Sequence, residues 1–141
     1  MLVNLTPHPI KIVVHGGEIE VQPSGILVRL KPHEEIIGGI EATDGKGKIL
    51  IPVEKVEYKG ITFLKDGKEI PQEEAIENIR KGVDTAEAVY VIVPQLISPV
   101  AEELAKLLAP AFILAPNTNK AIRDEKGRVV GVKSLILLAK T

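Results

Sequence analysis

The chain has 141 residues and a net charge of -1, with 45% hydrophobic and 26% charged residues. This length and composition predict a single domain spanning residues 1–141 and argue against disorder, collagen and coiled coil. The balanced charge leaves no strong field to attract a nucleic acid polymer or an anionic membrane, and the absence of cysteine excludes disulfides and thiolate metal sites.

A β-hairpin at residues 10–22 is the clearest local feature. Its first half alternates apolar and polar residues up to Val14, as a half-buried strand does. Gly16-Gly17 follows and suits a type I′ turn, because both central positions of that turn need positive φ. A two-residue turn there pairs Val14 with Ile19, which places the apolar side chains of both strands on one face.

Further short strands are expected in the rest of the first half. They cover residues 25–30, 49–56 and 61–64, and the turn Asp66-Gly67 follows them. Residues 31–48 look like a loop with room for one short strand at 36–40. Short strands at this spacing favour a bent antiparallel sheet or a partly closed barrel.

The second half predicts two helices and a parallel crossover. The first helix covers residues 71–81, with acidic residues in its first turn and Gly82 at its end. The crossover consists of a strand at 89–93, a helix with Ser98 as N-cap and Pro99 at its first position, and a strand at 112–115. A closing hairpin is expected at 121–138. The predicted fold class is therefore α+β: a mixed, mainly antiparallel sheet or partly closed barrel, with an N-terminal β-hairpin and about two helices.

Three polar segments follow predicted strands and are candidate ligand-binding loops. In the first, Asn4, Thr6 and His8 alternate in a proline-stiffened stretch and so share one face. The second runs from Gln95 to Ser98 at a helix start, where free backbone N–H groups suit an anion. The third offers amides, a hydroxyl and positive charge for a phosphate, through Asn117, Thr118, Asn119, Lys120 and Arg123.

Together these loops predict one polar pocket for a small anionic ligand, such as a nucleotide or another phosphate-bearing molecule. A plainer interpretation exists for each: turn residues that satisfy the backbone, a capped helix and a solvated loop. A second hypothesis is a hydrolase of a nucleotide or phosphoester with His8 as catalytic acid or base. The sequence holds no complete catalytic constellation, no glycine-rich phosphate loop and no histidine spacing for zinc, so we favour binding, without metal or cofactor.

Two stretches resemble a group of small, uncharacterised bacterial and bacteriophage proteins. These are Asn4-Leu5-Thr6-Pro7-His8 near the start, and Pro116-Asn117-Thr118 followed by Arg123-Asp124, Gly127 and Gly131 toward the end. The resemblance implies no mechanism, and it leaves open a structural role in a phage or host assembly. An aspartate commonly stands at the position of Asn117 in that group, so a catalytic carboxylate there would be missing in this chain.

We expect a cytoplasmic homo-oligomer, in the first instance a dimer. No segment resembles a signal peptide or a membrane span, and a composition rich in Glu, Lys and Ile suits a heat-stable protein. The last predicted strand, 133–138, carries four successive aliphatic residues, so both of its faces are apolar. At a sheet edge it would expose one of them to a partner subunit.

Overall fold

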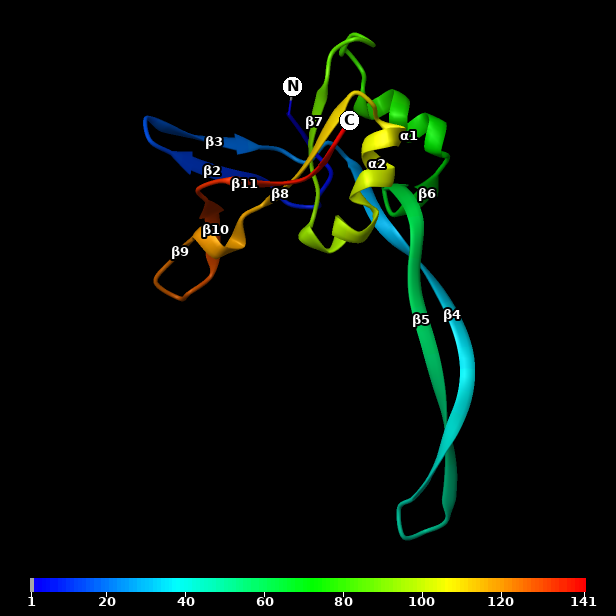
Figure 1. The fold of residues 1–141 in the computed structure, drawn as a ribbon. Helices are drawn as coiled ribbons and strands as arrows, with labels where there is room; N and C mark the ends of the chain where they lie inside the picture. The colour runs from blue at the N-terminus through cyan, green and yellow to red at the C-terminus, as the bar shows by residue number, and fades with distance from the viewer. Residues whose placement is uncertain (1) are drawn as a thin grey trace.

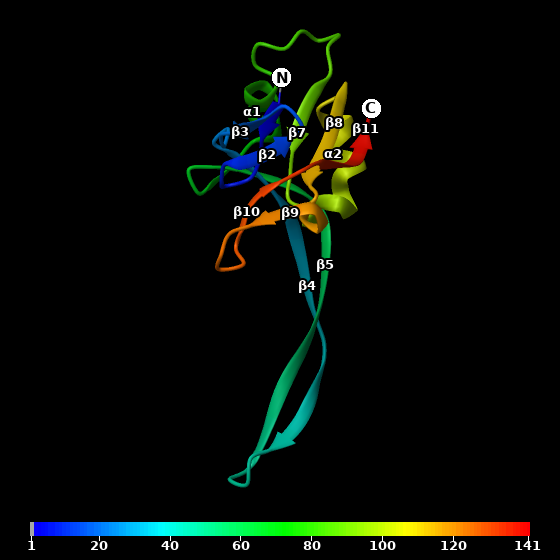
Figure 2. The same cartoon turned by 90° about the vertical axis from the view of Figure 1, so that its left-hand side faces the viewer.

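The computed structural model describes residues 2–141 and shows a body from which one long β-hairpin projects (Figures 1 and 2). In chain order the elements are β1 (Leu2–Asn4), β2 (Ile10–Val14), β3 (Gly17–Val21), β4 (Ile26–Thr43), β5 (Lys48–Lys65), β6 (Lys68–Ile70), α1 (Gln72–Ile79), β7 (Val89–Ile92), η1 (Gln95–Val100), α2 (Ala101–Leu107), β8 (Ala111–Pro116), η2 (Thr118–Lys120), β9 (Ala121–Arg123), β10 (Val129–Val132) and β11 (Leu135–Lys140). The α+β class is confirmed: the chain has mixed sheets and two α-helices, and no barrel closes among residues 2–141.

The central sheet has the strand order β1-β7-β8-β11. Strands β1, β7 and β8 are parallel, and β11 pairs antiparallel with β8. Alternate residues of β7 and β8 are fully buried against the helices, including Val91 and Ile113 opposite Leu104 of α2 in the same core. The predicted strand–helix–strand crossover is therefore confirmed, and the three parallel strands end at one edge of the sheet.

The start of the second helix differs from the prediction. The chain turns as the 3₁₀-helix η1 from Gln95, and α2 begins only at Ala101. Ser98 and Pro99 lie inside η1, and the Ser98 side chain caps no helix. The turn starts early because Pro94, in extended conformation, already occupies the capping position before η1.

A second sheet has the order β3-β2-β10-β9. The predicted hairpin is present, but Ile12 lies opposite Ile19 and Val14 opposite Gly17, so its turn is His15-Gly16. The predicted register was therefore displaced by two residues, which leaves the same side chains on the same face. The closing hairpin is shorter than expected: β9 pairs with β10, and β11 then leaves for the central sheet.

The projecting hairpin, which we call the β-arm, consists of β4, β5 and the turn between them. The prediction of a loop at 31–48 was wrong, because β4 continues unbroken to Thr43 and pairs with β5 along its whole length. Irregularities after Leu30 and Ile36 absorb Pro32 and the Gly38-Gly39 pair, the residues that made this segment look like a loop. Only the base of the arm joins the core, through residues such as Val28 and Phe63.

Candidate functional site

The loop after β1 is held by the side chain of Asn4, which is 1% exposed. Its Nδ2 donates to the carbonyl oxygens of His8 (2.8 Å) and Val21 (3.0 Å). Its Oδ1 accepts from the backbone N–H of Thr6 (2.9 Å) and from the Thr6 hydroxyl (2.6 Å). These four bonds use both donors and both lone pairs of the carboxamide. Asn4 and Thr6 therefore shape the loop, as in the plainer interpretation, rather than facing a ligand.

His8 is exposed and belongs to this loop through its backbone. Its carbonyl oxygen accepts from the side chains of Asn4 and Thr6. Within residues 2–141 no carboxylate lies in hydrogen-bond contact with its imidazole, so the described chain offers no partner that would orient it as an acid or base.

The second and third predicted loops do come together. Gln95 Nε2 donates to the carbonyl oxygen of Pro116 (3.0 Å) and lies 3.5 Å from Thr118 Oγ1. Asn117 Nδ2 donates to Ser134 Oγ (3.1 Å), and its buried Oδ1 has no hydrogen-bond partner among the described residues. The parallel pairing of β7 and β8 explains this meeting, because both loops leave the same edge of the sheet.

The other predicted site residues are exposed to solvent or bond to the local backbone. Ser98, Asn119 and Lys120 are exposed. Arg123 Nη1 donates to the carbonyl oxygen of Gly127 (2.8 Å) and so closes the β9–β10 turn. Gln95 and Thr118 therefore belong to a polar contact between two loops.

One hollow is apolar and lies where the arm meets the body. It has a volume of about 540 Å³ and is lined by Leu5, Pro7, Leu27, Val28, Arg29, Leu30, Tyr58, Pro94 and Leu96. We call it the arm-base groove. A smaller hollow of about 250 Å³ is lined by residues that include Lys11, Thr118 and Val130. Neither hollow has the mainly polar lining that the sequence predicted.

The distal part of the arm carries an exposed apolar surface that the sequence analysis missed. The register pairs Ile40 with Ile51, and the neighbouring pairs on the same side of the ribbon are Gly38–Val53 and Ala42–Ile49. These six residues form what we call the distal apolar face. Ile40 is 59% exposed, Ile49 53% and Ile51 48%. The signal was the apolar alternation at Ile49, Ile51 and Val53, which mirrors Ile40 and Ala42 across a glycine-containing turn.

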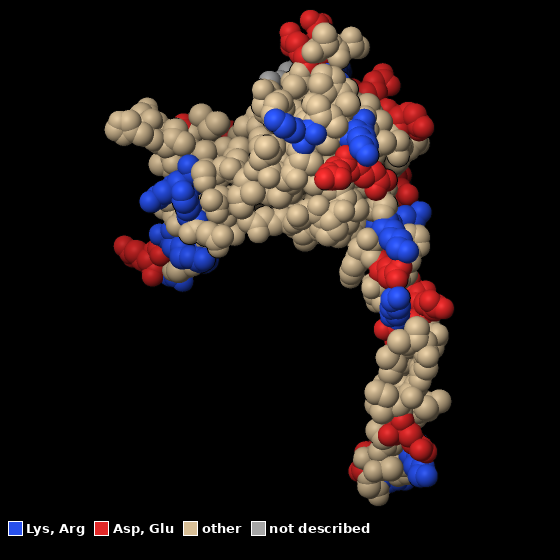
Figure 3. Space-filling model, viewed as in Figure 1, with Lys and Arg blue, Asp and Glu red and all other residues tan. Residues whose placement is uncertain are grey.

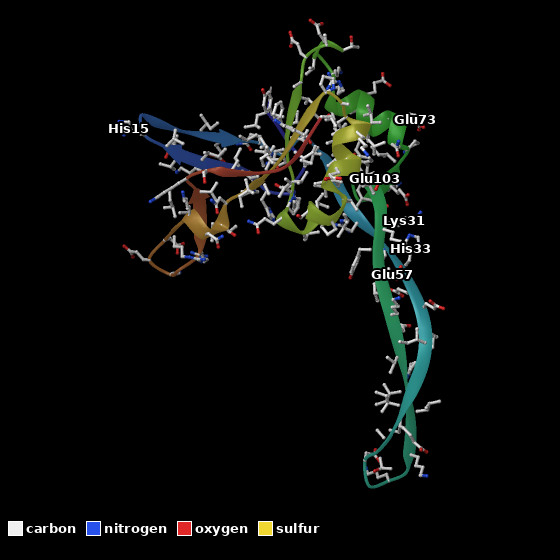
Figure 4. All side chains as sticks on the ribbon, viewed as in Figure 1. His15, Lys31, His33, Glu57, Glu73 and Glu103 are labelled. Atoms are coloured by element: carbon white, nitrogen blue, oxygen red, sulfur yellow. The ribbon has the colours of Figure 1, made fainter. Side chains whose placement is uncertain are left out.

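Charged residues flank the distal apolar face on both sides along the arm (Figure 3). Toward the body, Glu57 pairs with Lys59 (2.7 Å) and Lys55 (2.9 Å), and His33 lies beside them (Figure 4). The two lysines, Lys59 first, hold the pKa of Glu57 below its ordinary value. At the tip Lys48 lies 3.6 Å from Glu41. An apolar band thus lies between two charged, solvated segments.

Comparison of the chain with family models, curated proteins and solved structures finds no match. Within the described residues no three potential metal ligands gather in one place, and none of the helices at 2–141 combines the length and apolarity needed to cross a bilayer. The resemblance of the two end motifs to bacterial and phage proteins therefore stays a resemblance.

Proposed function

We propose that the protein is a structural subunit that assembles with further copies of itself by docking its β-arm on one of them. The observation that carries this proposal is the distal apolar face, whose isoleucines are exposed on a ribbon that stands away from the body in both views (Figures 1 and 2). An isolated two-stranded ribbon is marginally stable in water, and a contiguous exposed apolar surface marks an interaction site. A partner that covers the arm would bury this apolar surface and so stabilise the ribbon.

The total surface of the chain supports the same proposal. It exposes 9369 Å², whereas a compact monomer of its mass exposes about 7,100 Å². The excess of roughly 2,200 Å² exceeds the ~800 Å² that one partner contributes to a standard interface.

The charges at the tip favour a protein partner over a lipid bilayer. The turn between β4 and β5 holds Asp44 and Lys46, and Glu41 and Lys48 stand beside it. Insertion of the apolar band into hydrocarbon would carry these charges in first, at a cost of several kcal/mol. A protein surface can cover the band from the side and leave the tip in water.

Sedimentation velocity of the full chain tests the proposal. The wild type should sediment as a multiple of 15.3 kDa at micromolar concentration. Ile51→Lys should dissociate it, because a lysine in the middle of an apolar contact has no partner for its charge. Ile19→Lys, on an equally exposed residue of β3, is the matched control and should leave the assembly intact. A wild type that sediments as one chain at every concentration contradicts the proposal.

We propose binding of a small anionic ligand as a weaker second function. Its support is the smaller hollow, where the Thr118 hydroxyl and Lys11 come from different segments. Adenosine diphosphate and inorganic phosphate should then each raise the midpoint of thermal unfolding, and Thr118→Ala should remove that rise. Equal midpoints with and without these anions would dismiss this function and leave the assembly proposal untouched.

A further inference from the structure

We infer that the distal apolar face of one copy docks in the arm-base groove of another copy of the same chain. The inference rests on the proposed function and adds to it the surface that receives the arm. Both halves of the contact, an exposed apolar band and an open apolar groove, are present on one chain and unfilled.

The arm-base groove is built before anything docks in it. One wall is the loop that Asn4 holds from within, and the backbone N–H of Leu5 ties that loop to the carbonyl oxygen of Ile92 (2.8 Å). The opposite wall is the base of the arm. Leu96, 62% exposed, and Tyr58, 57% exposed, stand at the groove with their apolar surface in water. Rigid walls and solvated apolar side chains are the properties of a docking pocket.

The arm cannot fill the groove of its own chain. Residues Leu27–Leu30 at the base of the arm line the groove, whereas the distal apolar face begins at Gly38. Ten residues of extended strand separate Leu30 from Ile40, or about 33 Å. Figure 1 shows the arm running straight away from the body, without a fold back toward it. The groove and the distal face can therefore meet only between copies.

Charge allows two copies to approach in this way. Residues 38–53 carry two acidic and two basic side chains, Glu41, Asp44, Lys46 and Lys48, so this part of the arm has no net charge. Among the residues lining the groove, Arg29 is the charged one. The contact therefore brings a neutral apolar band to a nearly neutral apolar groove, with no like charges opposed.

The surplus surface leaves room for two contacts on each copy. Each copy takes part in two contacts, one with its arm and one with its groove. At standard size each contact buries ~800 Å² per chain, or about 1,600 Å² in all. The surplus of roughly 2,200 Å² over a compact monomer is large enough for both.

Docking by the face of the ribbon is favoured over pairing of strand edges. Pro32 and Pro52 lack the N–H that edge pairing needs, and two register shifts twist the arm. Because the two surfaces in contact differ, the contact is heterologous. It closes as a reciprocal dimer or a ring, or continues as a filament, according to the angle between copies.

Two variants that each lose one half of the contact test the inference. Ile51→Lys places a charge in the distal apolar face and keeps the groove intact. Leu96→Lys places a charge in the groove and keeps the distal apolar face intact. Both side chains are exposed in one chain, so neither change disturbs the core. Each variant alone should sediment as a monomer, with self-association weakened about 100-fold or more. An equimolar mixture should form a heterodimer of two 15.3 kDa chains and nothing larger, because one intact arm meets one intact groove.

Failure of the inference and failure of the proposed function give different results. If Ile51→Lys is monomeric while Leu96→Lys assembles like the wild type, the arm docks elsewhere, and the inference is overturned while the proposed function stands. Two monomeric variants that form no heterodimer also overturn it, because the intact arm of Leu96→Lys then fails to bind the intact groove of Ile51→Lys. A wild type that never associates overturns both.

Crosslinking gives a second measurement that does not depend on introduced charges. The chain has no cysteine, so Ile51→Cys and Leu96→Cys each introduce a single thiol. Treatment of an equimolar mixture with a short bismaleimide should join one chain of each kind, and Ile19→Cys in place of Ile51→Cys should give background crosslinking. Predominant joining of Ile51→Cys chains to each other would place two arms side by side and refute docking in the groove.

Discussion

Asn4 joins its own loop to the end of β3 through one buried carboxamide. Within the loop it bonds to Thr6 and directly to the carbonyl oxygen of His8, and its bond to Val21 reaches β3. The sequence marked this residue as important because a polar group stands among prolines. The sequence does not show whether the Asn4 side chain points into the protein or toward solvent, because Val21, one of the partners of the carboxamide, lies seventeen residues away.

Replacement of Asn4 should therefore reduce stability. Asn4→Ala removes the acceptor of the buried Thr6 N–H, the side-chain donor to the Val21 carbonyl oxygen and one of the two donors to the His8 carbonyl oxygen, and we expect the free energy of unfolding to fall by ~3 kcal/mol. Urea denaturation measures the change. His8→Ala is the control, and because its imidazole is exposed it should alter the same quantity by less than ~0.5 kcal/mol. A nearly neutral Asn4→Ala would contradict the structural role given to this residue.

The hydrogen bonds of Asp124 in the β9–β10 turn should make the free energy of unfolding depend on pH. Its carboxylate accepts from the backbone N–H groups of Arg128 and Lys126, at 2.9 Å each. These bonds, with the one from Arg128 contributing most, lower the pKa of Asp124 in the folded chain. The unfolded chain then takes up this proton at higher pH than the folded one. The stabilisation is therefore present above the ordinary aspartate pKa of about 3.9 and is lost as pH falls through the folded value.

The neutral variant Asp124→Asn isolates this contribution. The wild type should be the more stable of the two at about pH 6, and the difference in free energy of unfolding should shrink as the pH is lowered toward about pH 3. Chemical denaturation at a series of pH values measures the difference. A gap that stays constant over this range would show that the carboxylate titrates alike in both states.

At the scale of elements, local signals were sufficient where an element packs on the core. The helix at 72–79 follows from its acidic first turn and from the spacing of Ala75 and Ile79, both buried. The hairpin at 10–21 follows from alternation and glycine. The β-arm has no buried face over most of its length, so the pattern predicted short strands at 25–30, 49–56 and 61–64 and not one continuous hairpin. The strand at 31–43 forms because it pairs with β5. The sequence of one strand does not show which segment it pairs with, so this strand could not be predicted from its own residues.

Arg80 ties α1 to the segments around it. Its Nη1 donates to the carbonyl oxygens of Leu108 (2.8 Å) and Pro110 (2.9 Å), and its Nη2 to those of Asp84 (2.9 Å) and Glu87 (2.6 Å). A lysine keeps the charge but lacks the planar fork that serves two pairs of acceptors. The guanidinium is therefore a structural joint between α1, the following loop and the end of α2.

Arg80→Lys should consequently lower the free energy of unfolding by ~2 kcal/mol, since at least two carbonyl oxygens lose their donor. Lys81→Ala, on an exposed neighbour, provides the comparison and should stay within ~0.5 kcal/mol of the wild type. Thermal and urea denaturation both report the change. Equal stability of Arg80→Lys and wild type would mean that the fork is dispensable.

At the scale of the whole molecule, the body and the arm are stabilised by different interactions. The body has a core of aliphatic side chains between the central sheet and the helices. The arm beyond Leu30 is a ribbon held by its backbone ladder, with the ion pair Lys48–Glu41 between the two strands near the tip. The sequence predicts a homo-oligomer in which the last strand, β11, contacts the partner subunit. That strand does form a sheet edge with Leu137 exposed, but the larger unpartnered surface lies on the arm.

The central claim is that the arm is covered when copies of the chain assemble. Amide hydrogen exchange along the arm tests this claim most directly. At concentrations where the protein is assembled, amides of residues 33–57 should exchange slowly. On dilution, or in Ile51→Lys at any concentration, they should exchange at nearly the unprotected rate, because the free ribbon opens readily. Amides of β7 and β8 should stay protected throughout. Arm amides that exchange equally fast in an assembled wild type would contradict the claim, because the arm would then be outside the contact.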